Sequence, residues 1–217
     1  QNRIVLCMPS SQTLAIARNK YVLYKTFEYD DLVPSISTYL SGEVPITLLP
    51  AIAKPYNGRS SEGVLRISNV KELEEVSSKS GYIFQEIIEG PVFTVDYIRN
   101  SYTDKDFSIV REELLRTKNG AGTTVRMSND MSLKRLVSHI GNMIQVNGCI
   151  NMEFIQSKGK YYLIDINPRF SAGVAFSHMA GYNMVLNHLN CFIVQDIQAP
   201  VLYQEQIITK RYREEIL

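Results

Sequence analysis

The sequence predicts an α+β protein, on three observations. Strand-like and helix-like segments alternate along the chain without the regular spacing of βαβ units, which disfavours a doubly wound parallel sheet. Apolar residues recur with helical periods in some segments and with strand periods in others. The composition, 45% hydrophobic and 21% charged over 217 residues, is that of a globular chain with room for one large domain or two small ones.

Helices are predicted where apolar residues recur at three- and four-residue steps. Leu14, Ala17 and Tyr21 mark the first helix in this way. Asn69 and Glu72 form a capping-box pattern that opens the second. Helices are therefore expected at residues 12–28, 69–76, 133–143 and 182–194.

Strands are predicted by runs rich in β-branched and aromatic residues between glycine and proline signals. Gly90-Pro91 separates two of these runs, and Ser157-Lys158-Gly159 joins two others as a hairpin. The stretch 116–124, which contains Gly120 and Gly122, is expected to be a mobile loop. Strands are expected at residues 51–54, 64–67, 82–88, 92–99, 108–115, 150–156 and 160–166.

Composition excludes several classes of protein. The net charge is +1, without the strongly basic balance of a general nucleic-acid binder. No apolar run reaches the ~18 residues of a membrane span, and the N-terminus lacks the apolar segment of a signal peptide. The three cysteines, Cys7, Cys149 and Cys191, are too widely spaced for a disulfide framework or a zinc site. We therefore expect a cytoplasmic protein with reduced thiols, and neither nucleic acid nor membrane as a partner.

Acidic and amide side chains gather on the predicted hairpin. Asp165 and Asn167 point to one face because side chains alternate along a strand, and Glu153 lies on the neighbouring strand. Mg²⁺ prefers oxygen ligands at ~2.1 Å and often completes its shell with ATP phosphates. The three residues suit a magnesium site, although an ordinary hairpin with a polar solvent face produces the same pattern.

The hairpin loop decides whether Glu153 meets Asp165. A simple two-residue loop at Lys158-Gly159 makes Glu153 face Ile164, so that its side chain points away from Asp165. A three-residue loop or a bulge places Glu153 opposite Asp165 instead. Gly159 can supply the positive φ that such a loop needs.

Two runs on this hairpin are distinctive: G-C-I-N-M-E-F at residues 148–154 and D-I-N-P-R-F-S-A-G at 165–173. Together they resemble the metal-binding end of ATP-grasp enzymes, most closely the carbamoyl-phosphate-synthetase-like branch. The resemblance extends more weakly over most of the chain. It implies that Arg169 contacts the transferred phosphate or the substrate carboxylate. It also implies that two Mg²⁺ ions, with Mn²⁺ as a substitute, bind Glu153, Asp165 and Asn167, where Asp165 replaces a commoner glutamate.

A polar loop at residues 57–63 follows the apolar strand that ends at Lys54. Glycines let backbone N–H groups approach phosphate oxygens, and serine hydroxyls add donors, but a plain surface turn has the same composition. The resemblance implies a loop that covers the phosphates of ATP, with one lysine before it and a second near the middle of the first helix. Taken alone, that second lysine fits a solvated helix charge equally well. The implied phosphate contacts are Lys20, Lys54, Gly58, Ser60 and Ser61.

The strand at residues 84–90 resembles the hinge between the two lobes of ATP-grasp proteins, which binds adenine through backbone groups. Family members commonly carry a ribose-binding glutamate two residues after the hinge glycine, where this chain has Val92. The missing hydrogen bond costs roughly 1.5–3 kcal/mol of nucleotide affinity unless another carboxylate replaces it. The implied nucleotide contacts are Glu86, Ile87, Ile88 and, as the replacement, Glu89.

Basic residues surround the glycine-bearing stretch 116–124. They fit a solvated basic segment, or, by the resemblance, an active-site loop with a cation for the acyl phosphate. Arg116 is then the candidate, and joins Lys54 and Arg169 as an expected catalytic group. The basic residues are Arg111, Arg116, Lys118 and Arg126.

The resemblance implies an ATP-grasp fold with nucleotide between two α+β lobes. The small lobe is expected at residues 21–89 and the large lobe, with the metal site, at 90–197. Residues 1–20 are expected to be the remnant or end of a preceding domain that is missing or vestigial, and 198–217 a tail.

The implied function is an ATP- and Mg²⁺-dependent, ADP-forming ligase. It activates a small carboxylate as an acyl phosphate for attack by an amine, and a homo-oligomer is one implied assembly. Two alternatives stay open within the same fold. One is a non-catalytic nucleotide-binding module. The other is a carboxyphosphate or carbamate phosphorylation of the carbamoyl-phosphate-synthase type.

Overall fold

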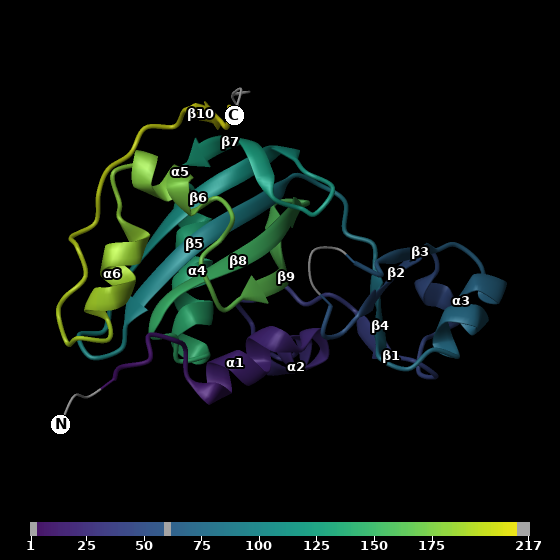
Figure 1. The fold of residues 1–217 in the computed structure, drawn as a ribbon. Helices are drawn as coiled ribbons and strands as arrows, with labels where there is room; N and C mark the ends of the chain where they lie inside the picture. Colours follow the sequence, from purple (N-terminus) through teal and green to yellow (C-terminus); the bar gives the residue numbers. More distant parts are fainter. Residues whose placement is uncertain (1–3, 59–61, 212–217) are drawn as a thin grey trace, which may run out of the picture.

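The computed structural model describes residues 4–58 and 62–211, and within these ranges the strands form two antiparallel sheets (Figure 1). The larger sheet has the strand order β10-β7-β6-β5-β8-β9, and the smaller has the order β1-β4-β2-β3. This arrangement confirms the predicted α+β class. The strands are β1 (Thr38–Leu40), β2 (Ala51–Pro55), β3 (Leu65–Ile67), β4 (Tyr82–Glu86), β5 (Val92–Asn100), β6 (Lys105–Arg116), β7 (Gly122–Ser128), β8 (Gly148–Ser157), β9 (Lys160–Asn167) and β10 (Ile207–Thr209).

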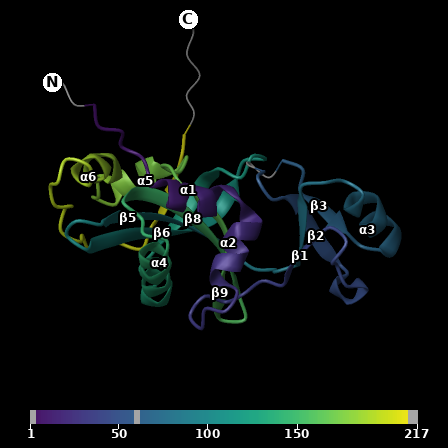
Figure 2. The same ribbon diagram turned by 90° about the horizontal axis from the view of Figure 1, so that it is seen from below.

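Helices cover both faces of the larger sheet, with α4 on the side opposite α5 and α6 (Figure 2). Helices α1 and α2 pack, like α4, against the core on the α4 side of the larger sheet. Residues from 21 onward were expected in the small lobe, but α2 belongs to this core. Helix α3 covers one face of the smaller sheet. The helices are α1 (Ser11–Arg18), α2 (Lys20–Phe27), α3 (Val70–Ser77), α4 (Met131–Met143), α5 (Val174–Met179) and α6 (Met184–Asn190), with a short 3₁₀ turn at Ile46–Leu48.

The helix predicted at residues 12–28 is two helices, separated at Asn19. Asn19 has an extended backbone, with φ −129° and ψ 109°, and its side-chain oxygen accepts hydrogen bonds from the amides of Tyr21 and Val22. Asparagine caps a helix in this way because its carbonyl satisfies free amides of the first turn. Lys20, expected near the middle of one helix, therefore opens the second.

Other element boundaries were also wrong. The expected loop at 116–124 already contains the start of strand β7 at Gly122, and the expected strand 82–88 ends at Glu86. The helix predicted at 182–194 spans only Met184–Asn190, and Asn183 caps its start by accepting a hydrogen bond from the Leu186 amide. Strands β1 and β10 and helix α5 were not predicted. The predicted cap of α3 is confirmed, since Asn69 Oδ1 accepts from the Glu72 amide, but the Glu72 carboxylate accepts from the amide of Ser68 and not from that of Asn69.

Alternation along β5 decides which face of the larger sheet each side chain joins. Phe93, Val95 and Tyr97 pack into the core under α4, whereas Ile98 belongs to the core under α5 and α6. Asp96 lies on this second face, together with polar residues of β6, β8 and β9 that the two helices leave uncovered. The exposed part of this face borders the smaller sheet and holds the candidate site.

Candidate functional site

A bulge in the β8–β9 hairpin pairs Glu153 with Asp165. The loop is a two-residue turn in which Ser157 pairs with Lys160, and both Lys158 and Gly159 have positive φ, 48° and 74°. The register then shifts between Glu153, which pairs with Asp165, and Phe154, which pairs with Leu163. Ile164 is therefore the extra residue of a β-bulge. Of the two loop alternatives, the structure has the bulge, and it turns Asp165 toward Glu153's face of the sheet.

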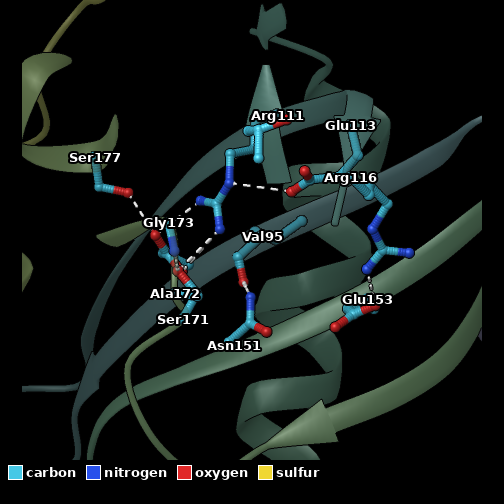
Figure 3. Close-up of polar contacts among 12 residues, drawn as sticks. Val95, Arg111, Glu113, Arg116, Asn151, Glu153, Ser171, Ala172, Gly173 and Ser177 are labelled. Atoms are coloured by element: carbon cyan, nitrogen blue, oxygen red, sulfur yellow. Dashed lines mark hydrogen bonds and ion pairs between the residues drawn. The ribbon is translucent and has the colours of Figure 1, made fainter. Parts of the chain in front are cut away.

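Both carboxylates are ion-paired with cations from other segments. Lys20 Nζ lies 2.9 Å from Asp165 Oδ1 and also donates to the Gly58 carbonyl at 3.1 Å. Arg116 Nη2 donates to Glu153 Oε2 at 2.8 Å (Figure 3). The Nε of Arg116 donates to the Gly120 carbonyl at 2.8 Å. Burial raises the pKa of Glu153, and the Arg116 guanidinium acts in the opposite direction. The four charged groups are each 14–26% exposed, so solvent ions and ligands can reach them.

A cavity of about 260 Å³ lies between the two sheets, and we call it the first cavity. Its charged end is formed by Lys20, Lys54, Arg116, Glu153 and Asp165, and its remaining wall is largely apolar. Sequence reasoning found only Ile88 of this apolar wall. Strand alternation carried the signal for two more residues, since Ile52 is two residues from Lys54 and Ile155 is two residues from Glu153. The isoleucines of the wall are Ile36, Ile52, Ile88, Ile155 and Ile164.

Lys54 reaches from β2 to the bulge, where its Nζ donates to the carbonyl of Ile164 at 3.4 Å. Removal from water lowers the pKa of Lys54 to about 8, and nearby Lys20 acts in the same direction. Asp165 and Glu153 oppose this shift without cancelling it. In this environment, an additional anion such as a phosphate group stabilises the charged form of the lysine when it binds beside it.

We predict that the affinity for Mg·ADP decreases as the pH rises through about 8. Above that value the amine of Lys54 loses its proton, and with it the charge that attracts phosphate. Calorimetric titration from pH 6.5 to 9.5 measures the effect, and Lys54→Arg is expected to flatten the profile because arginine stays charged. An identical profile in both proteins would show that Lys54 does not contact the phosphates.

The other predicted nucleotide contacts are divided between two places. Gly58, Glu86 and Ile88 line the first cavity, and the Glu86 carboxylate accepts a hydrogen bond from the Ser37 amide at 2.8 Å. Ile87 and Glu89 are absent from this lining and face an adjoining groove, which shares Glu86 and Ile88 with the first cavity. Ser60 and Ser61 lie outside the described residues. Val92 opens β5 opposite Ile155.

A second cavity, of about 250 Å³, continues from the first across the ion pairs. Asn167 and Arg169 line it, and Arg169 Nη2 donates to Asn167 Oδ1 at 3.2 Å. Arg111 also lines this cavity, whereas Arg126 pairs with Glu112 away from it. The two cavities share three residues: Arg116, Glu153 and Asp165.

The donor set fits Mg²⁺ only with help from a ligand. Glu153, Asp165 and Asn167 offer hard oxygen donors, and the lysine and arginine that now neutralise the carboxylates mark where a cation is stable. Over the described ranges, no group of three or more His, Cys, Asp or Glu side chains is placed to hold a metal ion. Mg²⁺ commonly binds through one or two carboxylates plus substrate phosphates, which agrees with this arrangement.

A protein-family profile described as an ATP-grasp domain matches residues 17–173. The chain belongs to the ATP-grasp family. The match includes the smaller sheet, every strand of the larger sheet except β10, all residues that line the first cavity, and the hairpin with its bulge. The ATP-grasp fold predicted from the hairpin motifs is thereby confirmed.

Solved ATP-grasp structures have the same fold at low sequence identity. Biotin carboxylase from Campylobacter jejuni, in its complex with β-γ-ATP, superposes with a TM-score of 0.78 at 16% identity, over 90% of this chain and 50% of that one. The biotin carboxylase domain of Hydrogenobacter thermophilus 2-oxoglutarate carboxylase, bound to MgADP and bicarbonate, has a TM-score of 0.76 at 15% identity, over 90% and 49%. L-amino acid ligase from Bacillus licheniformis has 0.64 at 19% identity, over 83% and 49%.

The chain spans about half the length of these ATP-grasp structures. No curated protein sequence matches it significantly. Within the described part of the chain, no helix combines the length and the apolar character that crossing a membrane requires.

Proposed function

We propose that this ATP-grasp chain carries out the ATP-dependent activation of a small carboxylate for attack by an amine, with release of ADP. The observation that carries the proposal is the junction of the two cavities. Arg116, Glu153 and Asp165 line both, so a phosphate group at the end of the first cavity is adjacent to a substrate in the second. The β-γ-ATP bound to the biotin carboxylase, and the ligase activity that names the L-amino acid ligase, agree with this class of reaction.

The residues suit a reaction in two steps. A carboxylate oxygen of the substrate attacks the γ-phosphorus of ATP, the bond to the β-phosphate oxygen breaks, and ADP leaves. An amine nitrogen then attacks the acyl carbon, the bond to the phosphate oxygen breaks, and the nitrogen loses a proton. Such phosphoryl transfer is accelerated mainly by positioning and by charge neutralisation.

Each cation and carboxylate has a proposed role in that scheme. Lys20 and Lys54 hold the phosphates of the nucleotide, and Arg169 with Arg116 neutralises the carboxylate and the transferred phosphate. Glu153, Asp165 and Asn167 are the proposed ligands of two Mg²⁺ ions, for which Mn²⁺ is a substitute. Bound there, Mg²⁺ neutralises phosphate charge and orients the transferred group. The backbone near Glu86 and Ile88, with the isoleucine wall, is the proposed adenine site.

One observation favours a non-catalytic nucleotide-binding module as the second candidate. The ribose contact expected of the family falls on Val92, and the proposed replacement, Glu89, is exposed and lines a different groove. A nucleotide then binds without that hydrogen bond, at a cost of roughly 1.5–3 kcal/mol.

We expect the whole chain to release ADP from Mg·ATP only when a suitable acid is present. The assay measures ADP against a panel of small acids, amino acids and bicarbonate, with hydroxylamine as the nucleophile. Hydroxamate in the product identifies an acyl phosphate, whereas ADP release with bicarbonate alone indicates the carboxyphosphate alternative. If Mg·ADP binds in calorimetry but no acid in the panel stimulates ADP release, the non-catalytic module is the better interpretation.

A further inference from the structure

A buried cluster of charges forms the wall of the second cavity, on the side away from the hairpin. Arg111 and Glu113 of β6, which Figure 3 shows, form this cluster with Asp96 of β5. The three side chains are only 1–2% exposed. Arg111 Nη1 donates to Asp96 Oδ2 at 2.8 Å, and Arg111 Nη2 donates to Ser171 Oγ at 2.9 Å. Arg111 and Glu113 both line the cavity.

Two carboxylates in this cluster share one guanidinium. Asp96 takes the short contact with Arg111 and a further hydrogen bond from Ser177 Oγ at 2.6 Å. Glu113 has only a longer contact, 3.4 Å from Arg111 Nε to its Oε1. Among the described residues, neither Arg111 Nε nor Glu113 Oε2 has a hydrogen-bond partner. A buried polar atom without a partner costs free energy, and a ligand that donates a hydrogen bond to Glu113 removes that cost.

Glycines make the space that the cluster occupies. A Cβ atom added to Gly122, the first residue of β7, would lie 1.7 Å from Glu113 Oε2. A Cβ atom added to Gly173 would lie 3.0 Å from Arg111 Nη2. Both glycines line the second cavity. Two glycines therefore flank the Arg111–Glu113 pair, whose hydrogen-bonding groups are not all satisfied.

We propose that Glu113 binds the ammonium group of the amine substrate in the second cavity. This inference rests on the proposed function and names the substrate class: a compact primary amine, protonated when it binds. An ammonium group supplies both the positive charge and the N–H donors that a cluster with one carboxylate in excess requires. A cavity of about 250 Å³ accommodates an amine of amino-acid size.

The position of Glu113 agrees with this role. The cavity that it shares with Arg116, Glu153 and Asp165 leads to the junction where the carboxylate is activated. Arg169 lies on the wall of the same cavity and is exposed. The carboxylate substrate can therefore bind at Arg169 and the amine at Glu113, within one cavity that leads to the junction.

The test uses two probes of nearly equal shape. L-Alaninamide carries an ammonium group, and L-lactamide has a hydroxyl in its place. Ligand-observed NMR titration of the whole chain is expected to give at least tenfold tighter binding of L-alaninamide. Glu113→Gln is expected to remove this preference, whereas the control Glu112→Gln retains it, because Glu112 pairs with Arg126 and does not line the cavity. Gly122→Ala, which displaces the Glu113 carboxylate without removing it, is expected to weaken L-alaninamide binding as well.

Equal binding of the two probes to the unmodified chain, or no saturable binding of L-alaninamide, would overturn the proposal. So would a preference that survives both Glu113→Gln and Gly122→Ala in proteins that unfold cooperatively. Calorimetry with Mg·ADP on the same samples separates this result from the proposed function. L-Alaninamide binding without nucleotide binding rejects the ligase and keeps the amine site, and the converse rejects the amine site alone.

Discussion

Asp165→Asn is expected to reduce ATP turnover by a factor on the order of 10²–10³. The substitution keeps the shape of the side chain but removes the negative charge that faces Lys20, Lys54 and the proposed Mg²⁺. Asp165 is 23% exposed at the edge of a cavity, and asparagine keeps a hydrogen-bond acceptor for Lys20, so the fold should persist. ADP release measured over a range of Mg²⁺ concentrations tests the first expectation, and urea unfolding tests the second.

Asp104→Asn is the matched control for this substitution. Asp104 also pairs with a cation, Arg99 at 2.7 Å, but it is 79% exposed and lines neither cavity. The Asp104→Asn substitution should therefore leave ATP turnover unchanged. If Asp165→Asn also leaves turnover unchanged at limiting Mg²⁺, the hairpin is not the metal site, and its polar face is an ordinary solvent face.

Arg111→Met is expected to lower the free energy of unfolding by about 3–5 kcal/mol. Arg111 is the largest fully buried side chain of the described residues, and its loss leaves Asp96 and Glu113 buried without a compensating charge. Methionine fills part of the volume, so the electrostatic loss accounts for most of the effect. The measurement is urea unfolding followed by far-UV circular dichroism at neutral pH.

Arg126→Gln provides the comparison, because it breaks an ion pair on the neighbouring strand that is 52% exposed on the arginine side. Its expected cost is below about 1 kcal/mol. The expectation for Arg111 fails if the two variants lose similar amounts of stability. That outcome would mean that Asp96 and Glu113 take up protons at little cost when Arg111 is absent.

Local patterns in the sequence determined the α+β class and much of the site's composition. Strand alternation places Asp165 and Asn167 on one face, and the same rule applied to Lys54 and Glu153 identifies Ile52 and Ile155 as neighbours in the cavity wall. The cap that Asn69 forms with the Glu72 amide was predictable because both partners lie within one helical turn. These features depend on residues close together in the chain, so periodicity and spacing are sufficient to find them.

Some short elements escaped prediction, although the three-residue strand β3 was predicted at 64–67. Strands β1 and β10 have three residues each, too few to show an alternation, and they exist because β4 and β7 offer free edges to pair with. Gly122 was predicted as a loop residue, yet it pairs with Arg116 and starts β7, and a side chain at this position would occupy the space of the Glu113 carboxylate.

The tertiary structure alone decided how the site is assembled. The sequence allowed either a simple turn or a bulge in the hairpin, and the bulge at Ile164 brings Asp165 opposite Glu153. Lys20 reaches Asp165 across 145 residues of sequence, and its position depends on the break at Asn19 and on the packing of α2 against the larger sheet. Contacts of this kind are determined by the burial of apolar faces from distant segments, and no local pattern of residues encodes the distance between two charges that such packing brings together.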